Sequence, residues 1–227
     1  MSASAAVHLQ GVGRRFGRRW ILSSLDLTVQ PGETLAIFGN NGTGKTTLLQ
    51  ILATLLSPTR GDITIFGHSL AREKNSIRRL TGYIGHAKQL YNHFTVDEYL
   101  ELVFRLRHKT TEKMRTRVDQ SLDTMGLTAH RQAIIETLSE GMKKRLTFCR
   151  LLLCDPRLIL LDEPHPTLDA QGKMIFDRLM REWKQNGKTI FIASHEHDQT
   201  LAHADRVVII NEGKFTHEVR DRNKYVE

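Results

Sequence analysis

The sequence predicts an α/β fold in which the strands of a parallel sheet alternate with helices. Short apolar runs of strand length, such as LILLD at 158–162, alternate with segments whose apolar residues recur at helical spacing. A glycine-rich loop at 39–44 joins one such run to a helix-like segment. With 227 residues, the chain is long enough for one good-sized core, or for one core with an inserted subdomain.

The first part of the chain is expected to form strands around one helix. Residues 7–10 and 25–29 alternate polar and apolar side chains as half-buried strands do, and 34–38 is a short apolar run. A helix is expected over 45–56, where apolar residues have helical spacing, and the segment ITIFG at 63–67 is expected to form a strand.

From about residue 70 to 135, strand-like runs are scarce and helical spacing prevails, which indicates a mainly helical insertion. Helices are expected over 96–107 and 114–127, the latter closing on Gly126. The later elements are expected in the order helix from Ser139 to about Leu153, strand 158–162, helix 169–185, strand 188–194, short helix 197–203 and strand 206–211.

Composition favours a globular protein of a reducing, cytoplasmic compartment. Hydrophobic residues make up 40% and charged residues 26%, and the formal charge of +8 is typical of proteins that bind nucleic acid, anionic lipid or a phosphorylated ligand, or only of a soluble surface. Cys149 and Cys154 are too few for a disulfide framework. The first residues lack an apolar signal segment, and every apolar run is far shorter than the ~20 residues of a membrane span. A membrane connection is therefore expected only through a partner.

Residues 39–47, GNNGTGKTT, form a phosphate-binding motif of the pattern G-x-x-x-x-G-K-[ST] between an expected strand and an expected helix. The glycines allow backbone N–H groups to turn towards phosphate oxygens. Lys45 supplies a charge near the β- and γ-phosphates, and the Thr46 hydroxyl can bind Mg²⁺. A plain glycine-rich turn does not need this Lys-Thr pair. The predicted nucleotide-binding residues of the loop are Gly39, Asn40, Asn41, Gly42, Thr43, Gly44, Lys45, Thr46 and Thr47.

A buried strand that ends in two acids, LILLDEP at 158–164, complements this loop. Parallel α/β sheets bind ligands at the carboxyl ends of their strands, so Asp162 is placed to reach Mg²⁺ and Glu163 to polarise a water molecule. Alone, two such acids would be a solvated strand end. Together with the loop, they predict a nucleotide-hydrolysis site in which Asp162 and Thr46 are metal ligands.

The segment TLSEGMKKRLTF at 137–148 has two interpretations. Ser139 is a suitable N-cap, because its hydroxyl can accept a backbone N–H of the first helical turn. A helix start also offers free N–H groups and a positive dipole end, which suit an anion. The segment alone leaves both open.

An ordered series of motifs identifies a family resemblance. With the loop at 39–47, the series resembles the ATP-binding cassette (ABC) ATPases over about residues 7–215. The further motifs are LSEG at 138–141, LDEP at 161–164, TLDA at 167–170 and SHEHD at 194–198.

The resemblance implies a P-loop NTPase core of the RecA-like type, with an N-terminal antiparallel β part and an inserted helical subdomain. Residues 1–227 would then form a single ABC ATPase domain. Its core would cover about 1–85 and 150–227, and its helical subdomain about 86–149.

The resemblance also implies roles for residues outside the loop. Ser139 and Gly141 fall in the signature motif, where the family pattern LSGGQ reads LSEGM, so Glu140 and Met142 depart from it. His195 falls at the switch histidine that approaches the γ-phosphate.

Three more family positions can be assigned, and the last of them departs from the family pattern. Leu168 and Asp169 fall in the D-loop, which crosses the subunit interface in the family. Phe16 falls where the family has an aromatic side chain stacked on adenine; a core or surface aromatic is the less favoured alternative. An ungapped alignment places His86 at the family's metal-binding and coupling glutamine, with Gln89 three residues later. Either side chain can act there, and a histidine binds a metal only through a neutral nitrogen.

In the family, the signature motif faces the ATP of a second subunit. The resemblance therefore implies two cassettes, most simply a homodimer, that hold two ATP and Mg²⁺ head to tail. Lys45, Glu163 and His195 are the expected catalytic residues: Glu163 activates water and His195 positions the γ-phosphate. Integral membrane permease subunits are expected partners, nucleic acid is not, and the expected location is peripheral, on the cytoplasmic face of the inner membrane.

The expected function is ATP hydrolysis that drives transport. Within the family, the IGH…LY…T…E stretch and LDAQG are most similar to the ATP-binding subunit of the haem exporter of cytochrome c maturation. The alternatives are a non-transport nucleotide switch acting on nucleic acid or the ribosome, suggested by the charge of +8, and a slow ATPase switch caused by His86.

Overall fold

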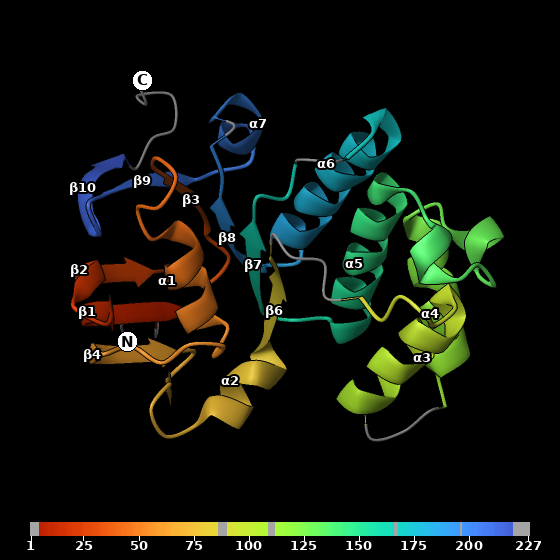
Figure 1. Ribbon diagram of the computed structural model, residues 1–227, viewed down its shortest axis with the longest axis horizontal. Helices are drawn as coiled ribbons and strands as arrows, with labels where there is room; N and C mark the ends of the chain where they lie inside the picture. Colours follow the sequence, from red (N-terminus) through yellow and green to blue (C-terminus); the bar gives the residue numbers. More distant parts are fainter. Residues whose placement is uncertain (1–4, 86–89, 109–111, 166–167, 196, 220–227) are drawn as a thin grey trace. The chain divides into compact units, whose positions relative to one another are not determined.

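The computed structural model describes residues 5–85, 90–108, 112–165, 168–195 and 197–219, in two compact units (Figure 1). The first unit comprises Met1–Gly85, Arg157–Pro164 and Arg181–Glu227. The second comprises His86–Pro156 and His165–Met180. All the described strands lie in the first unit, and the second is built of helices and short turns.

The larger sheet of the first unit has the strand order β10-β9-β3-β8-β7-β6. The strands from β9 to β6 are parallel, and β10 pairs antiparallel with β9. Every residue of β3, β7 and β8 is buried, as is usual in parallel sheets, which explains their continuous apolar runs. The strands are β3 (Thr34–Phe38), β6 (Thr81–Ile84), β7 (Leu158–Asp162), β8 (Thr189–Ala193), β9 (Arg206–Asn211) and β10 (Lys214–Val219).

The smaller sheet has the order β2-β1-β4-β5, and all its neighbouring strands are antiparallel. Its strands are β1 (Val7–Phe16), β2 (Arg19–Val29), β4 (Arg60–Ile65) and β5 (His68–Ser69). Together with the parallel sheet, it confirms the predicted α/β class with an antiparallel β part near the N-terminus.

Helix α1 (Lys45–Leu52) packs against β7 and β8 of the larger sheet and against β2 of the smaller one. Its buried leucines and isoleucine join the core between the two sheets. The expectation of a helix over 45–56 was wrong in length. Thr54 has a φ of +62°, a left-handed conformation that ends the helix, and its Oγ1 accepts a hydrogen bond from Arg78 Nε at 2.7 Å. The unit also contains α2 (Lys74–Leu80) and α7 (His197–Leu201).

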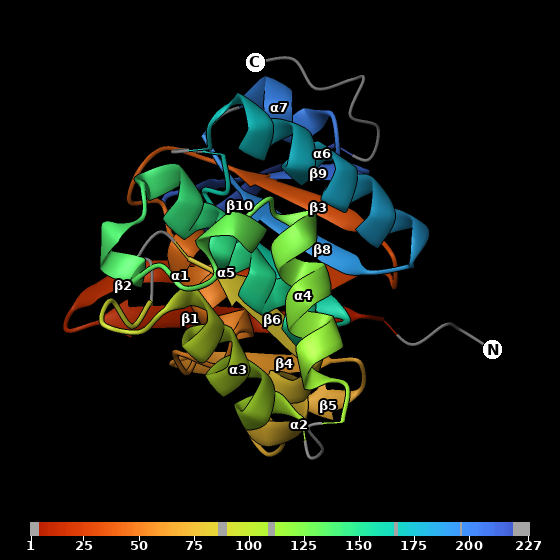
Figure 2. The ribbon, with the colours of Figure 1, turned by 90° about the vertical axis from the view of Figure 1, so that its right-hand side faces the viewer.

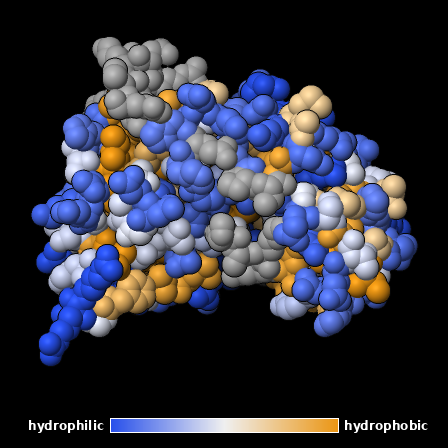
Figure 3. Space-filling view, turned by 45° about the horizontal axis from the view of Figure 1, so that its top comes forward, coloured by the Kyte–Doolittle hydropathy of each residue, from blue (hydrophilic) through white to orange (hydrophobic). Residues whose placement is uncertain are grey.

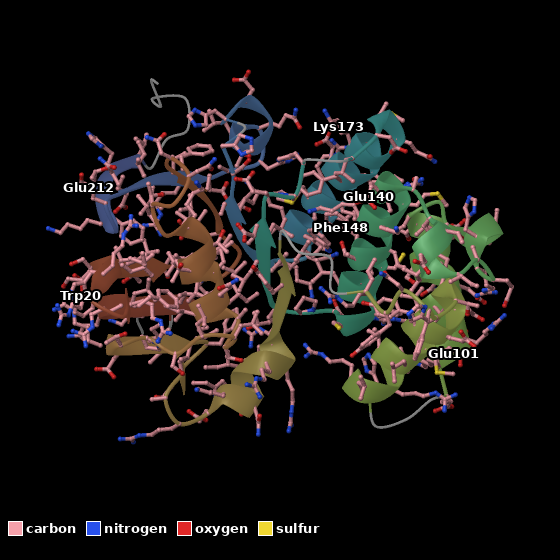
Figure 4. The ribbon with its side chains drawn as sticks, in the orientation of Figure 1. Trp20, Glu101, Glu140, Phe148, Lys173 and Glu212 are labelled. Atoms are coloured by element: carbon pink, nitrogen blue, oxygen red, sulfur yellow. The ribbon has the colours of Figure 1, made fainter. Side chains whose placement is uncertain are left out.

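In the second unit, helices α3, α4 and α5 pack on one another (Figure 2). Phe148 of α5, labelled in Figure 4, meets Phe176 of α6 edge to face, with 5.8 Å between ring centroids. Helix α6 belongs to this unit over residues 170–180 and to the first unit thereafter. The helices are α3 (Val96–Arg107), α4 (Met114–Thr124), α5 (Glu140–Cys154) and α6 (Ala170–Gln185), with 3₁₀ turns at Thr128–His130 and Ile135–Thr137.

Local capping explains why α3 begins where the sequence predicts. Thr95 Oγ1 accepts the Glu98 backbone N–H at 3.2 Å, and the Glu98 carboxylate accepts the Thr95 N–H at 2.8 Å. The hydrogen bonds that the Thr95 N–H and hydroxyl donate to the Glu98 carboxylate lower the pKa of Glu98. Asp97, on the first turn, forms ion pairs with Arg115 and Arg131, each at 3.0 Å, and thereby ties α3 to the chain around α4.

Candidate functional site

The glycine-rich loop at 39–44 connects the end of β3 to the start of α1. Gly39, Gly42 and Gly44 have φ of +149°, +81° and +111°, which residues with a Cβ rarely adopt. A Cβ on Gly44 would lie 2.4 Å from Leu22 Cδ2, so glycine there also allows the loop to approach β2. The glycines therefore hold a turned loop against the N-terminus of α1, where free N–H groups favour an anion.

Lys45, the first residue of α1, is only 7% exposed and points its ammonium group into this loop. Its Nζ donates to Gly39 O at 2.5 Å and to Asn40 O at 3.1 Å. Burial lowers the pKa of Lys45, while the charges of Glu163 and Asp162 act in the opposite direction. The other loop positions are exposed or half-buried: Asn41, Gly42, Thr43, Thr46 and Thr47.

Asp162 ends β7 beside the loop and is only 1% exposed. Thr46 Oγ1 donates to Asp162 Oδ1 at 3.1 Å, so the predicted pair of metal ligands is in direct contact. The second oxygen, Oδ2, accepts a hydrogen bond from Tyr83 Oη at 3.2 Å. Tyr83 was missed by the sequence prediction, because a tyrosine in a short strand carries no motif.

Glu163 is held in a strained conformation next to His195. Its φ of +50° is unusual for a residue with a long side chain, and its N–H donates to Ala193 O of β8 at 2.9 Å. Ser194 Oγ donates to Glu163 Oε2 at 3.3 Å, and His195 Nδ1 lies 2.9 Å from the same oxygen. The end of β8 thus orients the Glu163 carboxylate, whose side chain is 15% exposed.

Lys45, Thr46, Asp162, Glu163 and His195 come together from three chain segments that are far apart in sequence. Their strands β3, β7 and β8 are parallel neighbours, so their carboxyl ends share one edge of the sheet. The cluster combines a buried cation, two carboxylates, a hydroxyl and an imidazole around a loop that suits phosphate. This set of groups can bind a phosphorylated ligand and activate a water molecule.

Phe16 lies at the end of β1 with 45% of its surface exposed. The Arg14 guanidinium is 4.5 Å from its ring centroid, and Arg14 itself donates to Ser57 O at 2.9 Å. Trp20, across the hairpin, is 40% exposed and is covered by Arg60 at 4.6 Å (Figure 4 labels Trp20). Phe16 is therefore an accessible aromatic ring with a cation on one side, rather than a core residue.

Ser139 and Gly141 lie in the second unit, at the start of α5. Ser139 is the N-cap, and its Oγ accepts the Met142 N–H at 3.2 Å, as the capping interpretation predicts. Glu140, labelled in Figure 4, is 66% exposed, and Lys143 Nζ lies 3.5 Å from its carboxylate. The acid in the signature segment is thus paired with a cation one turn along its own helix.

The D-loop segment also lies in the second unit. Asp169 caps α6, since its Oδ1 accepts the Gly172 N–H at 2.7 Å, and Leu168 is 8% exposed. Arg145 of α5 donates to Gln171 Oε1 at 3.3 Å and lies 3.8 Å from the Asp169 carboxylate. Its guanidinium also donates to Met125 O at 3.0 Å, so this buried arginine joins three segments of the unit.

The two candidates for the coupling position, His86 and Gln89, lie outside the described residues. Their assignment as metal ligands remains a prediction from the sequence.

Comparison with known proteins agrees with the geometry. The profile of the ABC transporter family matches residues 22–166. A sulfate/thiosulfate import ATP-binding protein, CysA of Brucella melitensis, is 34% identical over 214 residues, which are 92% of this chain and 59% of the relative. The daunorubicin resistance ATP-binding protein DrrA3 of Streptomyces coeruleorubidus is 31% identical over 93% of this chain and 67% of its own length. The chain thus spans about three fifths of the length of the importer subunit.

Among solved structures, the dimeric post-hydrolysis state of the ATP-binding cassette MJ0796 bound to ADP and Pi is similar to this chain, with a TM-score of 0.86 and 25% identity. The similarity covers 94% of this chain and 98% of that one.

Proposed function

The chain belongs to the ABC transporter family, and from this premise we propose that it is a single ATPase domain that hydrolyses ATP to drive a membrane transporter. The contact between Glu163 and His195, beside a phosphate-binding loop, carries the proposal. The Glu163 backbone N–H is bonded to β8, and Ser194 and His195 contact the Glu163 carboxylate, so this carboxylate is oriented to activate a water molecule. The neighbouring imidazole is suited to donating a hydrogen bond to a phosphate oxygen.

In this proposal, each residue of the cluster has one task. The loop N–H groups and the Lys45 ammonium hold the β- and γ-phosphates, and Phe16 stacks on adenine with its exposed ring. Glu163 accepts a proton from the attacking water, and His195 positions the γ-phosphate. Lys45 Nζ donates hydrogen bonds to the Gly39 and Asn40 carbonyls, so contacts with the phosphates of ATP must replace these hydrogen bonds when the nucleotide binds.

The residues present fit a Mg²⁺ ion. Thr46 Oγ1 and Asp162 Oδ1 are oxygen donors 3.1 Å apart, and magnesium prefers oxygen ligands, with few of them from protein when phosphates supply the rest. Thr46 and Asp162 would hold the ion, directly or through water. When bound, Mg²⁺ offsets the negative charge that develops on the phosphates.

A second cassette is the proposed partner at the nucleotide. Ser139 and the N-terminus of α5 offer a hydroxyl and free N–H groups, which suit the γ-phosphate of an ATP held by another subunit. The dimeric state of the similar cassette MJ0796 supports this arrangement. We therefore propose a head-to-tail homodimer with two ATP and two sets of the motifs.

Integral membrane permease subunits are the proposed partners outside the nucleotide site, with the chain on the cytoplasmic face of the membrane. Among the described residues, no helix has the length and apolarity to cross a bilayer. Figure 3 shows a face on which hydrophilic residues prevail.

In the second unit, Tyr91, Phe94 and Ile134 are 59%, 37% and 47% exposed, and the Phe94 carbonyl accepts the Ile135 N–H. An apolar group of this kind supports docking of another protein.

For the transported substrate, we propose haem, exported for cytochrome c maturation. The sequence stretches around residues 84–98 and 168–172 support this subtype. Deleting the gene should abolish covalent haem staining of c-type cytochromes, and expression of the intact gene should restore it. Normal haem staining of c-type cytochromes in the deletion strain would refute the proposal of haem as the substrate and leave the ATPase proposal intact.

The ATPase proposal is tested with Glu163→Gln. The variant keeps the shape of the side chain and loses its basicity, so steady-state hydrolysis should fall about 10²–10⁴-fold while ATP binding remains. ATP should also trap a dimer that is visible in size-exclusion chromatography. The matched control is Asp62→Asn, which removes an exposed carboxylate on β4 and should leave turnover unchanged.

Unchanged hydrolysis in Glu163→Gln would refute the role of this carboxylate. Stimulation of the wild-type ATPase by co-expressed membrane subunits would support transport. Stimulation by DNA or RNA instead, with strong salt dependence, would favour the nucleotide switch that acts on nucleic acid.

A further inference from the structure

Tyr83 connects the candidate metal ligand Asp162 to the helix that begins at the phosphate-binding loop. It lies in β6, which pairs in parallel with β7, and its register partner is Leu160. From there its phenol reaches Asp162 Oδ2 at 3.2 Å, and the side chain of Gln50 on α1 also hydrogen-bonds the phenol. The carboxylate is therefore held at both oxygens, by Thr46 at Oδ1 and by Tyr83 at Oδ2.

The direction of the hydrogen bond is set by the chemistry around the phenol. An ionised carboxylate has only acceptor oxygens, so the phenol O–H donates the hydrogen bond to Asp162 Oδ2. The Gln50 side chain is able to donate to the phenol oxygen in turn, so the hydrogen bonds run in one direction towards Asp162.

The neighbouring Gly85 leaves room for this phenol. A Cβ at position 85 would lie 2.7 Å from Tyr83 Oη and 2.9 Å from its Cε1, closer than non-bonded atoms approach. Gly85 does not have a positive φ, so its backbone conformation does not require glycine. A side chain at this position would instead take the space of the Tyr83 ring. The absence of a side chain at Gly85 therefore allows the Tyr83 phenol to reach Asp162.

We propose that Tyr83 is a positioning residue for the magnesium site: it fixes the rotation of the Asp162 carboxylate so that Oδ1 stays beside Thr46. This inference rests on the proposed ATPase function. Asp162 is 1% exposed, so bulk water does not replace the phenol readily as a donor to Oδ2. Hydrogen-bond partners of a metal ligand orient it, and their loss commonly weakens metal binding by about 10–100-fold.

The test is Tyr83→Phe, which keeps the ring and removes only the donor. Binding of a fluorescent ATP analogue is titrated with Mg²⁺ and, separately, measured in EDTA. The concentration of Mg²⁺ for half-maximal effect should rise about tenfold, while nucleotide affinity in EDTA stays at the wild-type value. The thermal unfolding midpoint in EDTA should fall by a few degrees, because the buried carboxylate loses one donor, and the variant remains folded. Asp62→Asn, which changes an exposed carboxylate on β4, is the control and should change none of these quantities.

Gly85→Ala provides a second, independent variant. Its methyl group should displace the Tyr83 phenol and so raise the Mg²⁺ requirement. The double variant Tyr83→Phe/Gly85→Ala should need no more Mg²⁺ than Tyr83→Phe alone, because the hydrogen bond that the methyl group disturbs is already absent. An unchanged Mg²⁺ requirement in folded Tyr83→Phe overturns the inference. If the wild-type protein itself shows no Mg²⁺-dependent nucleotide binding, the proposed function fails instead, so the two failures are distinguishable.

Discussion

Replacing Gly39 with alanine places a methyl group against the backbone of β9. At a φ of +149°, the new Cβ would stand 2.3 Å from Ile210 O and 2.9 Å from Thr43 Oγ1. The Thr43 hydroxyl ends a short side chain that can rotate away. Ile210 O cannot, because β9 is paired with β3 on one side and β10 on the other. The substitution therefore forces the loop or the strand to move.

The size of the effect follows from two contributions. A non-glycine residue in this backbone region costs about 1–3 kcal/mol, and forcing a methyl group into a packed site costs about 1–3 kcal/mol. Gly39→Ala should thus lower the free energy of unfolding by about 2–6 kcal/mol. Gly42→Ala is the matched control: its φ is +81°, and nothing lies within 4 Å of its Cβ position, so only strain of about 1–2 kcal/mol is expected.

The assay is urea unfolding of the nucleotide-free protein, followed by circular dichroism. For a chain of this length, each kcal/mol also lowers the thermal midpoint by about 2–4 °C, which gives a second readout. Both variants carry alanine in the same loop, so loss of nucleotide contacts cannot account for a difference between them. Equal destabilisation by Gly39→Ala and Gly42→Ala would refute the close approach of the loop to Ile210 as the reason for Gly39.

Three further outcomes are expected. Thr95→Ala removes the cap of α3 and should cost about 1 kcal/mol in urea unfolding; wild-type stability would contradict the capping box. Burial raises the pKa of Cys149 to about 12, so this thiol should react with iodoacetamide only in urea, as read by mass spectrometry, and rapid native labelling would contradict its burial. Burial lowers the pKa of Lys45, so its ammonium loses the proton before exposed lysines do; ATP affinity should therefore fall as pH rises into the alkaline range, and a flat fluorescence titration would contradict this.

The confirmed part of the prediction rests on local patterns. The α/β class follows from runs such as 34–38 and 158–162, which are apolar throughout because their strands are buried at every residue. Helix α3 has the predicted bounds because Thr95 and Glu98 fix its start within four residues of sequence. Signals of this kind are contained in the segment itself.

Elements without such a signal were missed or mispredicted. Strand β10 is exposed or half-buried throughout, so it has no apolar run. Strand β6 has only four residues. Helix α1 ends early because Thr54 is left-handed, and periodicity continues past it to Leu55, which is 54% exposed. Backbone conformation at one residue overrides the pattern.

The roles of the site residues stay predictions, although the structure brings five of them together. Motifs identified Lys45, Asp162 and Glu163 because their chemistry depends on spacing along the chain. The phenol of Tyr83 on Asp162 and the guanidinium of Arg14 over Phe16 depend on contacts between strands and between side chains. One sequence contains no spacing that reports such contacts, so only the folded chain reveals them.

The buried Arg145 has a mechanical consequence. Its guanidinium donates hydrogen bonds to Met125 O, just after α4, and to the side chain of Gln171, and it lies 3.8 Å from the Asp169 carboxylate. These contacts connect the start of α6 directly to α5. The start of α6 is therefore linked, through one buried side chain, to the helix that Ser139 caps. In the proposed dimer, a displacement of Ser139 and a displacement of the start of α6 would be coupled through this guanidinium.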